Sequence, residues 1–367
     1  LSPPGRIATL IVPADSAWEQ TSGPAPVVPP PLRAQVPGER IREIAGVLRT
    51  REPAAILAGD VALLDPGIRS AACAAAKAGA RLLCGTFPAR LSRGAGRPRV
   101  ERIPYFPERA AEMLAGLRHV VLAGDRMTVP FFAYPTISSE ILPAGCRVHT
   151  LAEPGEDVVG ALDALADELG GGADPVVEAA SRPETGDGPI TPDGVARVVG
   201  ALLPENAILS DEGATSSLGS LPATAGAPPH DWLPLTGGAI GQGLPVAAGA
   251  ALACPDRKVV ALQADGSAMY TLQALWTQAR EKLDVTTILF SNRRYAILGM
   301  ELRRMANAEP TGRTAGLIDL SHPDLDWVQL ARGMGVEAEH VETLGGLRRA
   351  FAAAMRTPGP RLLEVPI

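Results

Sequence analysis

Short apolar runs alternate with longer stretches that are apolar on one side, and this rhythm starts near residue 39. Two of the short runs, 54–58 and 118–123, are each followed by Gly-Asp, and an Ala-rich stretch at 66–79 comes after the first. Further runs at 81–84 and 147–151 predict strands, and 157–169 predicts a closing helix. Strands that alternate with helices indicate a parallel, doubly wound sheet.

The same alternation returns after residue 190. Thr191 is placed to cap a helix that starts at Pro192, since proline is favoured at the first helical position. We expect strands at 207–210, 258–263, 285–290 and 361–365, with a helix at 272–282. The second half of the chain therefore predicts a second α/β domain with a parallel sheet.

Two segments rich in proline or glycine divide the chain. Residues 24–37 include three successive prolines, and 170–189 are polar and rich in Gly and Pro, which is typical of linkers. A β-type run at 6–12 precedes the first segment, and we expect it to be the end of a domain from a longer protein. We expect four parts: 1–38 as the tail of a preceding domain and a linker, 39–170 as a central α/β domain, 171–189 as a linker, and 190–367 as the C-terminal domain.

Composition narrows the class of protein. Apolar residues make up 46% of the 367 residues and charged residues 20%, so sizeable cores are expected. The net charge is −6 and no basic run occurs, which argues against a nucleic-acid partner. The sequence contains no unbroken stretch of about 20 apolar residues, so no membrane span is predicted. The cysteines form no C-x-x-C pair, so we expect reduced thiols in a cytoplasmic protein: Cys73, Cys84, Cys146 and Cys254.

The stretch 264–292 carries the strongest chemical signal. Asp265 follows one predicted strand and Asn292 follows the next, 27 positions later, from 265 to 292. The carboxyl ends of parallel strands meet at one edge of a sheet, so both side chains are expected there. Two oxygen ligands suit Mg²⁺, which prefers oxygen and bridges to phosphates. Gly266 would let a phosphate approach the backbone, and Ser267 can donate a hydroxyl.

This segment, ADGSAMYTLQALWTQAREKLDVTTILFSN, resembles the G-D-G-S and N-N motif of thiamine-diphosphate-dependent enzymes. Residues 236–252 (TGGAIGQGLPVAAGAAL) resemble the glycine-rich run that precedes the motif in that family. The pattern is most similar to benzoylformate decarboxylase and acetolactate-synthase-like members, and it covers the whole chain, more sharply in its second half. The resemblance implies two doubly wound parallel-sheet domains, of which 190–367 binds thiamine diphosphate through Mg²⁺.

The resemblance also implies roles for individual residues. Two side chains and one backbone carbonyl would bind Mg²⁺: Asp265, Asn292 and, through the carbonyl, Arg294. Six residues would contact the cofactor: Gly266, Ser267, Thr215 and Ser217 at the diphosphate, Ile240 as the support of its bent shape, and Gly238 as the carbonyl acceptor of the aminopyrimidine.

Two positions depart from the family motif. Its first glycine is Ala264 here and its first asparagine is Ser291, and neither change removes a metal-ligating side chain. Ala264 would weaken the site if its φ were positive.

The family's N-terminal pyrimidine-binding domain, which supplies an activating glutamate, is expected to be absent except for a last strand at 6–12. The catalytic group is therefore unassigned. This chain alone is expected to be inactive until that domain is supplied, in cis or on another chain. A homodimer or homotetramer is implied.

Several residues allow two interpretations. Glu212 is either a cofactor-site carboxylate or a residue that favours a helix start. His230 and His322 are expected in loops rather than at substrate. Met300, Leu302 and Met305 are expected in the core rather than around the substrate. Gly59-Asp60 and Gly124-Asp125 resemble a nucleotide site, and some family members bind FAD or ADP there. Without a G-x-G-x-x-G run we expect none here.

The sequence thus predicts a Mg²⁺- and thiamine-diphosphate-dependent lyase or transferase that acts on a small 2-oxo acid by decarboxylation, carboligation or both. The departures at Ala264 and Ser291 leave an alternative, a degenerate protein that binds cofactor or assembles without catalysis. A third hypothesis makes the central domain a nucleotide-responsive regulatory module.

Overall fold

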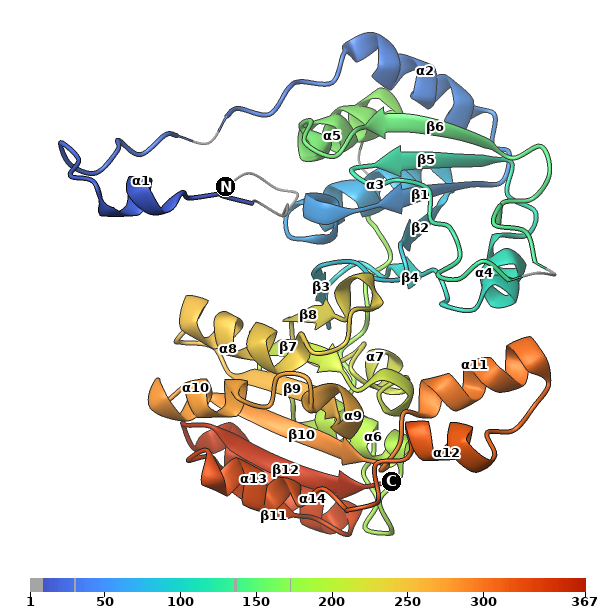
Figure 1. The fold of residues 1–367 in the computed structure, drawn as a ribbon. Coiled ribbons are helices and arrows are strands. Elements are labelled where there is room, and N and C mark those ends of the chain that lie inside the picture. The colour runs from blue at the N-terminus through green and yellow to red at the C-terminus, as the bar shows by residue number, and fades with distance from the viewer. Residues whose placement is uncertain (1–8, 30, 135–136, 172) are drawn as a thin grey trace. The chain divides into compact units, whose positions relative to one another are not determined.

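The computed structural model describes residues 9–29, 31–134, 137–171 and 173–367. The chain divides into two compact units (Figure 1). The first contains 1–85, 101–129 and 141–175, and the second contains 86–100, 130–140 and 176–367. The second unit therefore takes in two segments from the middle of the chain.

The first unit is built on a parallel sheet with the order β4-β2-β1-β5-β6. Two of its inner strands, β1 and β5, are buried along their whole length, as the mainly apolar runs predict, although β5 begins with His119. The strands are β1 (Ala54–Ala58), β2 (Arg81–Cys84), β4 (Glu101–Arg102), β5 (His119–Ala123) and β6 (Arg147–Ala152).

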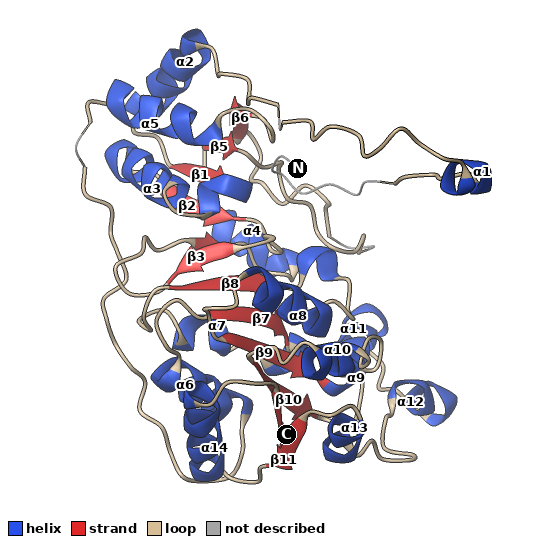
Figure 2. Cartoon of the chain, turned by 90° about the vertical axis from the view of Figure 1, so that its left-hand side faces the viewer, coloured by secondary structure: helices blue, strands red, loops and turns tan. Residues whose placement is uncertain are grey.

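Helices cover both faces of this sheet. Figure 2 shows α2, α3 and α5 along one side and α4 on the other, where Leu114 packs against Leu57 and Val120. The Ala-rich α3 ends at Gly79, whose φ of +67° and bonds to the carbonyls of Ala75 and Ala76 close the helix. The helices are α2 (Gly38–Arg49), α3 (Gly67–Ala78), α4 (Pro107–Leu114) and α5 (Val158–Glu168), with a short helix α1 (Ala14–Trp18) before them and a 3-10 turn η1 (Asp60–Leu63) after β1.

The second unit has a sheet with the order β11-β12-β10-β9-β7-β8-β3. All neighbours are parallel except β3, which pairs antiparallel with β8 at one edge. The strands are β3 (Leu91–Arg93), β7 (Ile208–Glu212), β8 (His230–Pro234), β9 (Val259–Ala264), β10 (Val285–Ser291), β11 (Glu337–His340) and β12 (Arg361–Pro366).

Helices also lie on both faces of the second sheet. Figure 2 shows α6 and α14 on one side and α8, α10 and α13 on the other. Leu244, Leu275 and Trp327 from the latter three helices pack on Leu289 of β10. The helices are α6 (Pro192–Leu202), α7 (Ser220–Ala223), α8 (Gly243–Ala253), α9 (Asp265–Ala268), α10 (Ala274–Arg280), α11 (Ala296–Ala306), α12 (Gly312–Ile318), α13 (Trp327–Gly333) and α14 (Leu344–Arg356), with 3-10 turns η2 (Ala214–Ser216) and η3 (Thr236–Gly238).

The predicted fold class is confirmed, since both units are doubly wound and their sheets are parallel apart from β3. The Thr191 side chain accepts a hydrogen bond from the Gly194 N–H, as the capping prediction requires. The strand expected at 6–12 is not found in the part that the structure describes. Residues 9–12 form no strand, pair with no described strand and are exposed. Residues 6–8 lie outside the described residues. None of the described helices combines the length and apolarity that crossing a bilayer requires.

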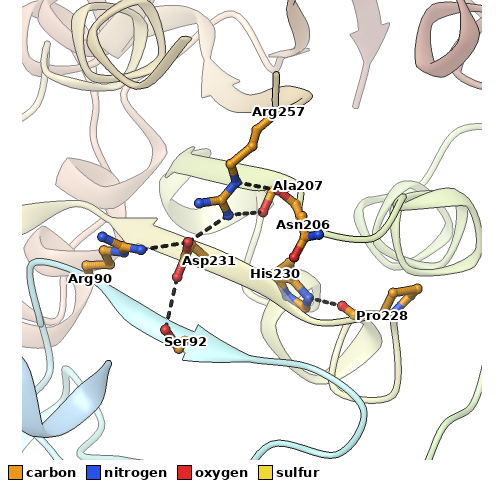
Figure 3. A network of polar contacts seen from close by, with 8 residues as sticks. All are labelled: Arg90, Ser92, Asn206, Ala207, Pro228, His230, Asp231 and Arg257. Carbon is orange, nitrogen blue, oxygen red and sulfur yellow. Dashed lines mark hydrogen bonds and ion pairs between the residues drawn. The ribbon is translucent and has the colours of Figure 1, made fainter. Parts of the chain in front are cut away.

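A polar cluster fastens β3 to β8 (Figure 3). The Asp231 carboxylate, 8% exposed, accepts hydrogen bonds from Arg90 Nη2 at 2.8 Å, Arg257 Nη2 at 2.7 Å and Ser92 Oγ at 3.0 Å. Burial alone would raise the pKa of Asp231, but the hydrogen bonds and charges of the two arginines outweigh it and lower that pKa. The segment that contains β3 is thus tied to β8 by an ion pair between Arg90 and the buried Asp231 carboxylate.

His230 lies beside this cluster at the start of β8 and is buried, so its assignment to a loop is wrong. Its Nδ1 lies 2.7 Å from the Pro228 carbonyl, which can only accept, so Nδ1 carries the proton. Burial lowers the pKa of His230 from 6.5 to about 4, assisted by the charges of Arg93 and Arg182. The folded protein therefore holds a neutral imidazole that the unfolded chain would protonate below pH 6.5.

We expect the free energy of unfolding to fall between pH 6.5 and 4 by up to about 3 kcal/mol because of His230. His230→Asn keeps an N–H donor and removes the titration, so its stability should depend less on pH in this window. Urea unfolding at several pH values measures the difference. Equal pH slopes for the two proteins would contradict this expectation.

Candidate functional site

The candidate site lies where the order of the second sheet reverses. From β7 the chain continues to β8 on one side, and from β9 it continues to β10 and β12 on the other. In open parallel sheets, ligands bind at such a switch point, outside the carboxyl ends of the strands. The turns that follow β7, β9 and β10 therefore meet at one edge.

Asp265 and Asn292 are brought to this edge as predicted. Ala264 pairs with Phe290, so Asp265 and Asn292 leave neighbouring strands close together. Asp265 is 1% exposed, and its Oδ2 accepts from the Arg293 N–H at 2.6 Å while its Oδ1 accepts from the Gly266 N–H at 2.8 Å. The Asn292 side-chain oxygen lies 3.0 Å from the Arg294 N–H, from which it accepts. The turn after β10 is thus folded onto the Asp265 carboxylate.

The chemistry of these groups fits a magnesium ion. Burial raises the pKa of Asp265, although the N–H groups of Arg293 and Gly266 oppose the shift, and a cation beside the carboxylate would stabilise its ionised form. Within the described residues no group of three or more His, Cys, Asp or Glu side chains could hold a metal. Mg²⁺ bound to a phosphate ligand needs only one or two protein carboxylates, because phosphate and water oxygens complete its shell.

Arg294, the third implied ligand, contributes a backbone carbonyl at the same turn. That oxygen accepts from the Ala296 N–H at 3.0 Å, and a carbonyl has a second lone pair for a metal. Arg293 before it has a φ of +55°, a rare conformation for a residue with a side chain.

The first part of the glycine-rich run, 236–242, forms a loop between β8 and α8, and 243–252 lie in α8. Gly238 has a φ of +67°, and a side chain there would lie 2.6 Å from the ring of Phe131, so only glycine fits. Ile240 follows with 36% of its surface exposed, which leaves its side chain open to a ligand. Phe131 belongs to the segment 130–140 that joins the second unit, a neighbour that the local sequence pattern does not predict.

The Gly266-Ser267 turn is tightly enclosed. A side chain at 266 would lie 2.7 Å from Cε1 of Tyr295, whose hydroxyl donates to the Gly266 carbonyl at 3.3 Å. Ser267 is 4% exposed, and its Oγ lies 3.1 Å from the Ala264 carbonyl. Burial raises the pKa of Tyr295, and Tyr270 and Asp265 add to the shift, so this hydroxyl stays protonated near neutral pH.

Thr215 and Ser217 lie in the turn after β7. Glu212 pairs with Gln263, so this turn runs beside the one that holds Asp265. Thr215 is half-buried in η2, whereas Ser217 is buried and its Oγ lies 3.5 Å from the Ala214 carbonyl. All nine implied site residues therefore belong to four turns of the second unit, those after β7, β8, β9 and β10.

The two departures from the motif fit without strain. Ala264 has a φ of −82°, so its methyl group incurs no backbone penalty, and the condition for a weakened turn is not met. Ser291 is the last residue of β10, where its carbonyl accepts from the Ile367 N–H.

His322 and the apolar residues Met300, Leu302 and Met305 of α11 lie outside these four turns. His322 is 86% exposed in a loop beside Asp319, as expected. Met300 and Leu302 are half-buried on α11, but Met305 is 61% exposed, so its placement in the core is wrong.

The two Gly-Asp turns of the first unit also lie at a switch point, between β1 and β5. A side chain at Gly59 would lie 2.6 Å from Cβ of Asp125, so the turns are in contact. Burial raises the pKa values of both Asp60 and Asp125.

Comparisons with known proteins agree with this geometry. The family described as "Thiamine pyrophosphate enzyme, C-terminal TPP binding domain" matches residues 218–365. A Mycobacterium tuberculosis protein described as "Putative acetolactate synthase large subunit IlvX" is 50% identical over 363 residues, which are 99% of this chain and 70% of that protein. The chain belongs to the thiamine-diphosphate-dependent enzymes.

One further relative bears on the type of thiamine-diphosphate enzyme, and one solved structure shows the fold. Benzoylformate decarboxylase of Pseudomonas aeruginosa is 32% identical over 297 residues, covering 73% of this chain and 54% of that protein. A thiamine diphosphate-dependent 4-hydroxybenzoylformate decarboxylase from Rhodococcus jostii has the same fold, with a TM-score of 0.72 at 24% identity over 96% of this chain and 67% of that structure. By these sequence relatives the chain is of the acetolactate synthase and benzoylformate decarboxylase type.

Proposed function

We propose that this chain binds thiamine diphosphate through Mg²⁺ and contributes to a decarboxylase or carboligase that acts on a 2-oxo acid. One observation carries the proposal: the buried Asp265 carboxylate and the Asn292 amide leave neighbouring strands at the switch point of the sheet. Asp265, Asn292 and the Arg294 carbonyl would hold the metal. Gly266, Ser267, Thr215 and Ser217 would contact the diphosphate.

When bound, thiamine diphosphate supplies the nucleophilic carbon that adds to a 2-oxo acid and takes up the electrons left by departing carbon dioxide. The chain's own residues bind and orient. Ile240, exposed on the glycine-rich loop, would support the bend of the cofactor, and the Gly238 carbonyl would accept its amino group. The ring of Phe131 beside Gly238 would exclude water from this side. The activating glutamate is proposed to come from a pyrimidine-binding domain, in cis or on another chain.

The family resemblance further implies a homodimer or homotetramer that works in the cytoplasm. The matched relatives include both synthases and decarboxylases, so the reaction is proposed at the level of 2-oxo acid cleavage or ligation.

Isothermal titration of thiamine diphosphate tests the proposal, with and without Mg²⁺. We expect binding that requires Mg²⁺, because the diphosphate and the buried Asp265 carboxylate are both anionic and the metal's charge would bridge them. The same titration on a protein that also carries the pyrimidine-binding domain, followed by assays with 2-oxo acids, tests the reaction. Absence of binding in both proteins would support the degenerate, non-catalytic alternative instead.

A further inference from the structure

Glu212 is a buried carboxylate that neither the metal nor the diphosphate contacts of the proposed site use. It ends β7 and is 1% exposed. Within the described part of the chain, no Lys, Arg or His forms an ion pair with it. A buried charge without a counter-ion is expensive unless hydrogen bonds satisfy it. Its partners therefore indicate what it stabilises.

Three of those partners are successive backbone N–H groups of the glycine-rich loop. Oε1 accepts from the Gly241 N–H at 2.5 Å and the Gln242 N–H at 3.2 Å, and Oε2 accepts from the Gly243 N–H at 2.8 Å. Gly243 begins α8, an 11-residue helix whose first N–H groups have no partner within the helix. The carboxylate thus satisfies these donors and also meets the positive end of the helix dipole.

The fourth partner leads to the diphosphate turn. Gln263 Nε2 donates to Glu212 Oε2 at 2.8 Å and to Ser267 Oγ at 2.7 Å. A carboxylate only accepts, so the amide nitrogen must face Glu212, which fixes the orientation of Gln263. Ser267 Oγ accepts from this amide and donates its own hydrogen to the Ala264 carbonyl at 3.1 Å, so the hydroxyl is held in one orientation at the diphosphate turn.

We propose that Glu212 and Gln263 form a brace, the Glu212–Gln263 brace, that positions the loop carrying Gly238 and Ile240 against the turn carrying Asp265 and Ser267. The brace would fix the separation between the part of the site that takes the aminopyrimidine and the part that takes the diphosphate. This inference rests on the function proposed for the same site. Glu212 and Gln263 are positioning residues, since they act through the loop and through Ser267.

Glu212→Gln tests the brace with little change in volume. The new amide group would face the N–H of Gly243 or the amide of Gln263, donor against donor. The loop should then open more often, because the charge that held its N–H groups is lost. We expect hydrogen exchange at Gly241, Gln242 and Gly243 to become at least about tenfold faster without cofactor. Binding of thiamine diphosphate at saturating Mg²⁺ should weaken at least about tenfold.

Glu364→Gln is the matched control. Glu364 is a second buried glutamate of the same sheet, 8% exposed on β12, and its carboxylate is paired with His340 at 3.2 Å. We expect this variant to lose some thermal stability but to keep loop exchange and cofactor affinity at wild-type values. A merely structural role for Glu212 would make the two variants behave alike, which would overturn the proposal.

Gln263→Met covers the case in which Glu212→Gln does not fold. It keeps Glu212 and its three backbone bonds and removes the amide that orients Ser267. We expect loop exchange within about twofold of wild type and affinity reduced at least about fivefold. Unchanged affinity in this variant would overturn the brace, as would unchanged exchange in Glu212→Gln. Failure of thiamine diphosphate to bind both the wild-type chain and the protein that also carries the pyrimidine-binding domain would instead count against the proposed function, because exchange in the free protein needs no cofactor.

Discussion

Replacing Asp265 by alanine is expected to weaken Mg²⁺-dependent binding of thiamine diphosphate at least about a hundredfold, ~2.7 kcal/mol. The substitution removes the buried carboxylate that would hold the metal, and it frees the N–H groups of Arg293 and Gly266 that fold the next turn onto the site. Both effects lower the affinity for thiamine diphosphate. Titration calorimetry at fixed Mg²⁺ measures the change.

Asp324→Ala is the control for this prediction. Asp324 also lies near Arg293, with its carboxylate 3.5 Å from the guanidinium, but its side chain is 61% exposed. An exposed pair of this kind contributes little, so its removal should leave affinity within about twofold. Circular dichroism establishes whether the Asp265→Ala chain is folded. A folded Asp265→Ala variant with wild-type affinity would show that the metal is held elsewhere.

Replacing Asp231 by asparagine is expected to lower the free energy of unfolding by about 2–3 kcal/mol at neutral pH. The carboxylate is buried and holds two arginines, so its neutralisation leaves Arg257 and Arg90 facing an amide that satisfies only part of their hydrogen bonds. The expected loss of unfolding free energy is at the lower end of the range for buried ion pairs, because Arg90 is 46% exposed and water can solvate it. Urea unfolding monitored by tryptophan fluorescence measures this loss, since the buried Trp232 directly follows Asp231 in the sequence.

Glu309→Gln provides the contrast in the same unit. The Arg303–Glu309 pair is as short, 2.7 Å, but the two side chains are 48% and 67% exposed. We expect a change below about 0.5 kcal/mol, because exposed pairs gain little over their hydrated state. Similar losses in the two variants would mean that burial does not strengthen the Asp231 cluster.

The local pattern of apolar and polar residues predicted most of the strands and the positions of Asp265 and Asn292. The runs 54–58 and 285–290 are mainly apolar, with Thr286 and Thr287 in the second, because their strands are buried on both faces of a sheet. Asp265 and Asn292 could be placed because each directly follows such a run, and parallel neighbours bring their carboxyl ends together.

Contacts between distant segments could not be predicted in this way. The Ser92–Asp231 hydrogen bond joins residues 139 positions apart, and nothing near Ser92 marks it as part of the second sheet. The place of Glu212 depends on a loop 29 to 31 positions away, so its sequence neighbours left two interpretations open. The exposed Met305 was misplaced because apolar character alone does not say which side of a helix is covered.

The edge strand β3 has a consequence for how the chain is made and divided. It is synthesised well over a hundred residues before β8, its partner, so during translation it must wait unpaired until most of the second unit has emerged. A fragment cut at residue 190 would lack β3 and would expose the backbone of β8, where another chain could pair with it. Asp231 would then keep Arg257 but lose Arg90 and Ser92. The second unit is continuous in space but not in sequence, and no single cut releases it whole.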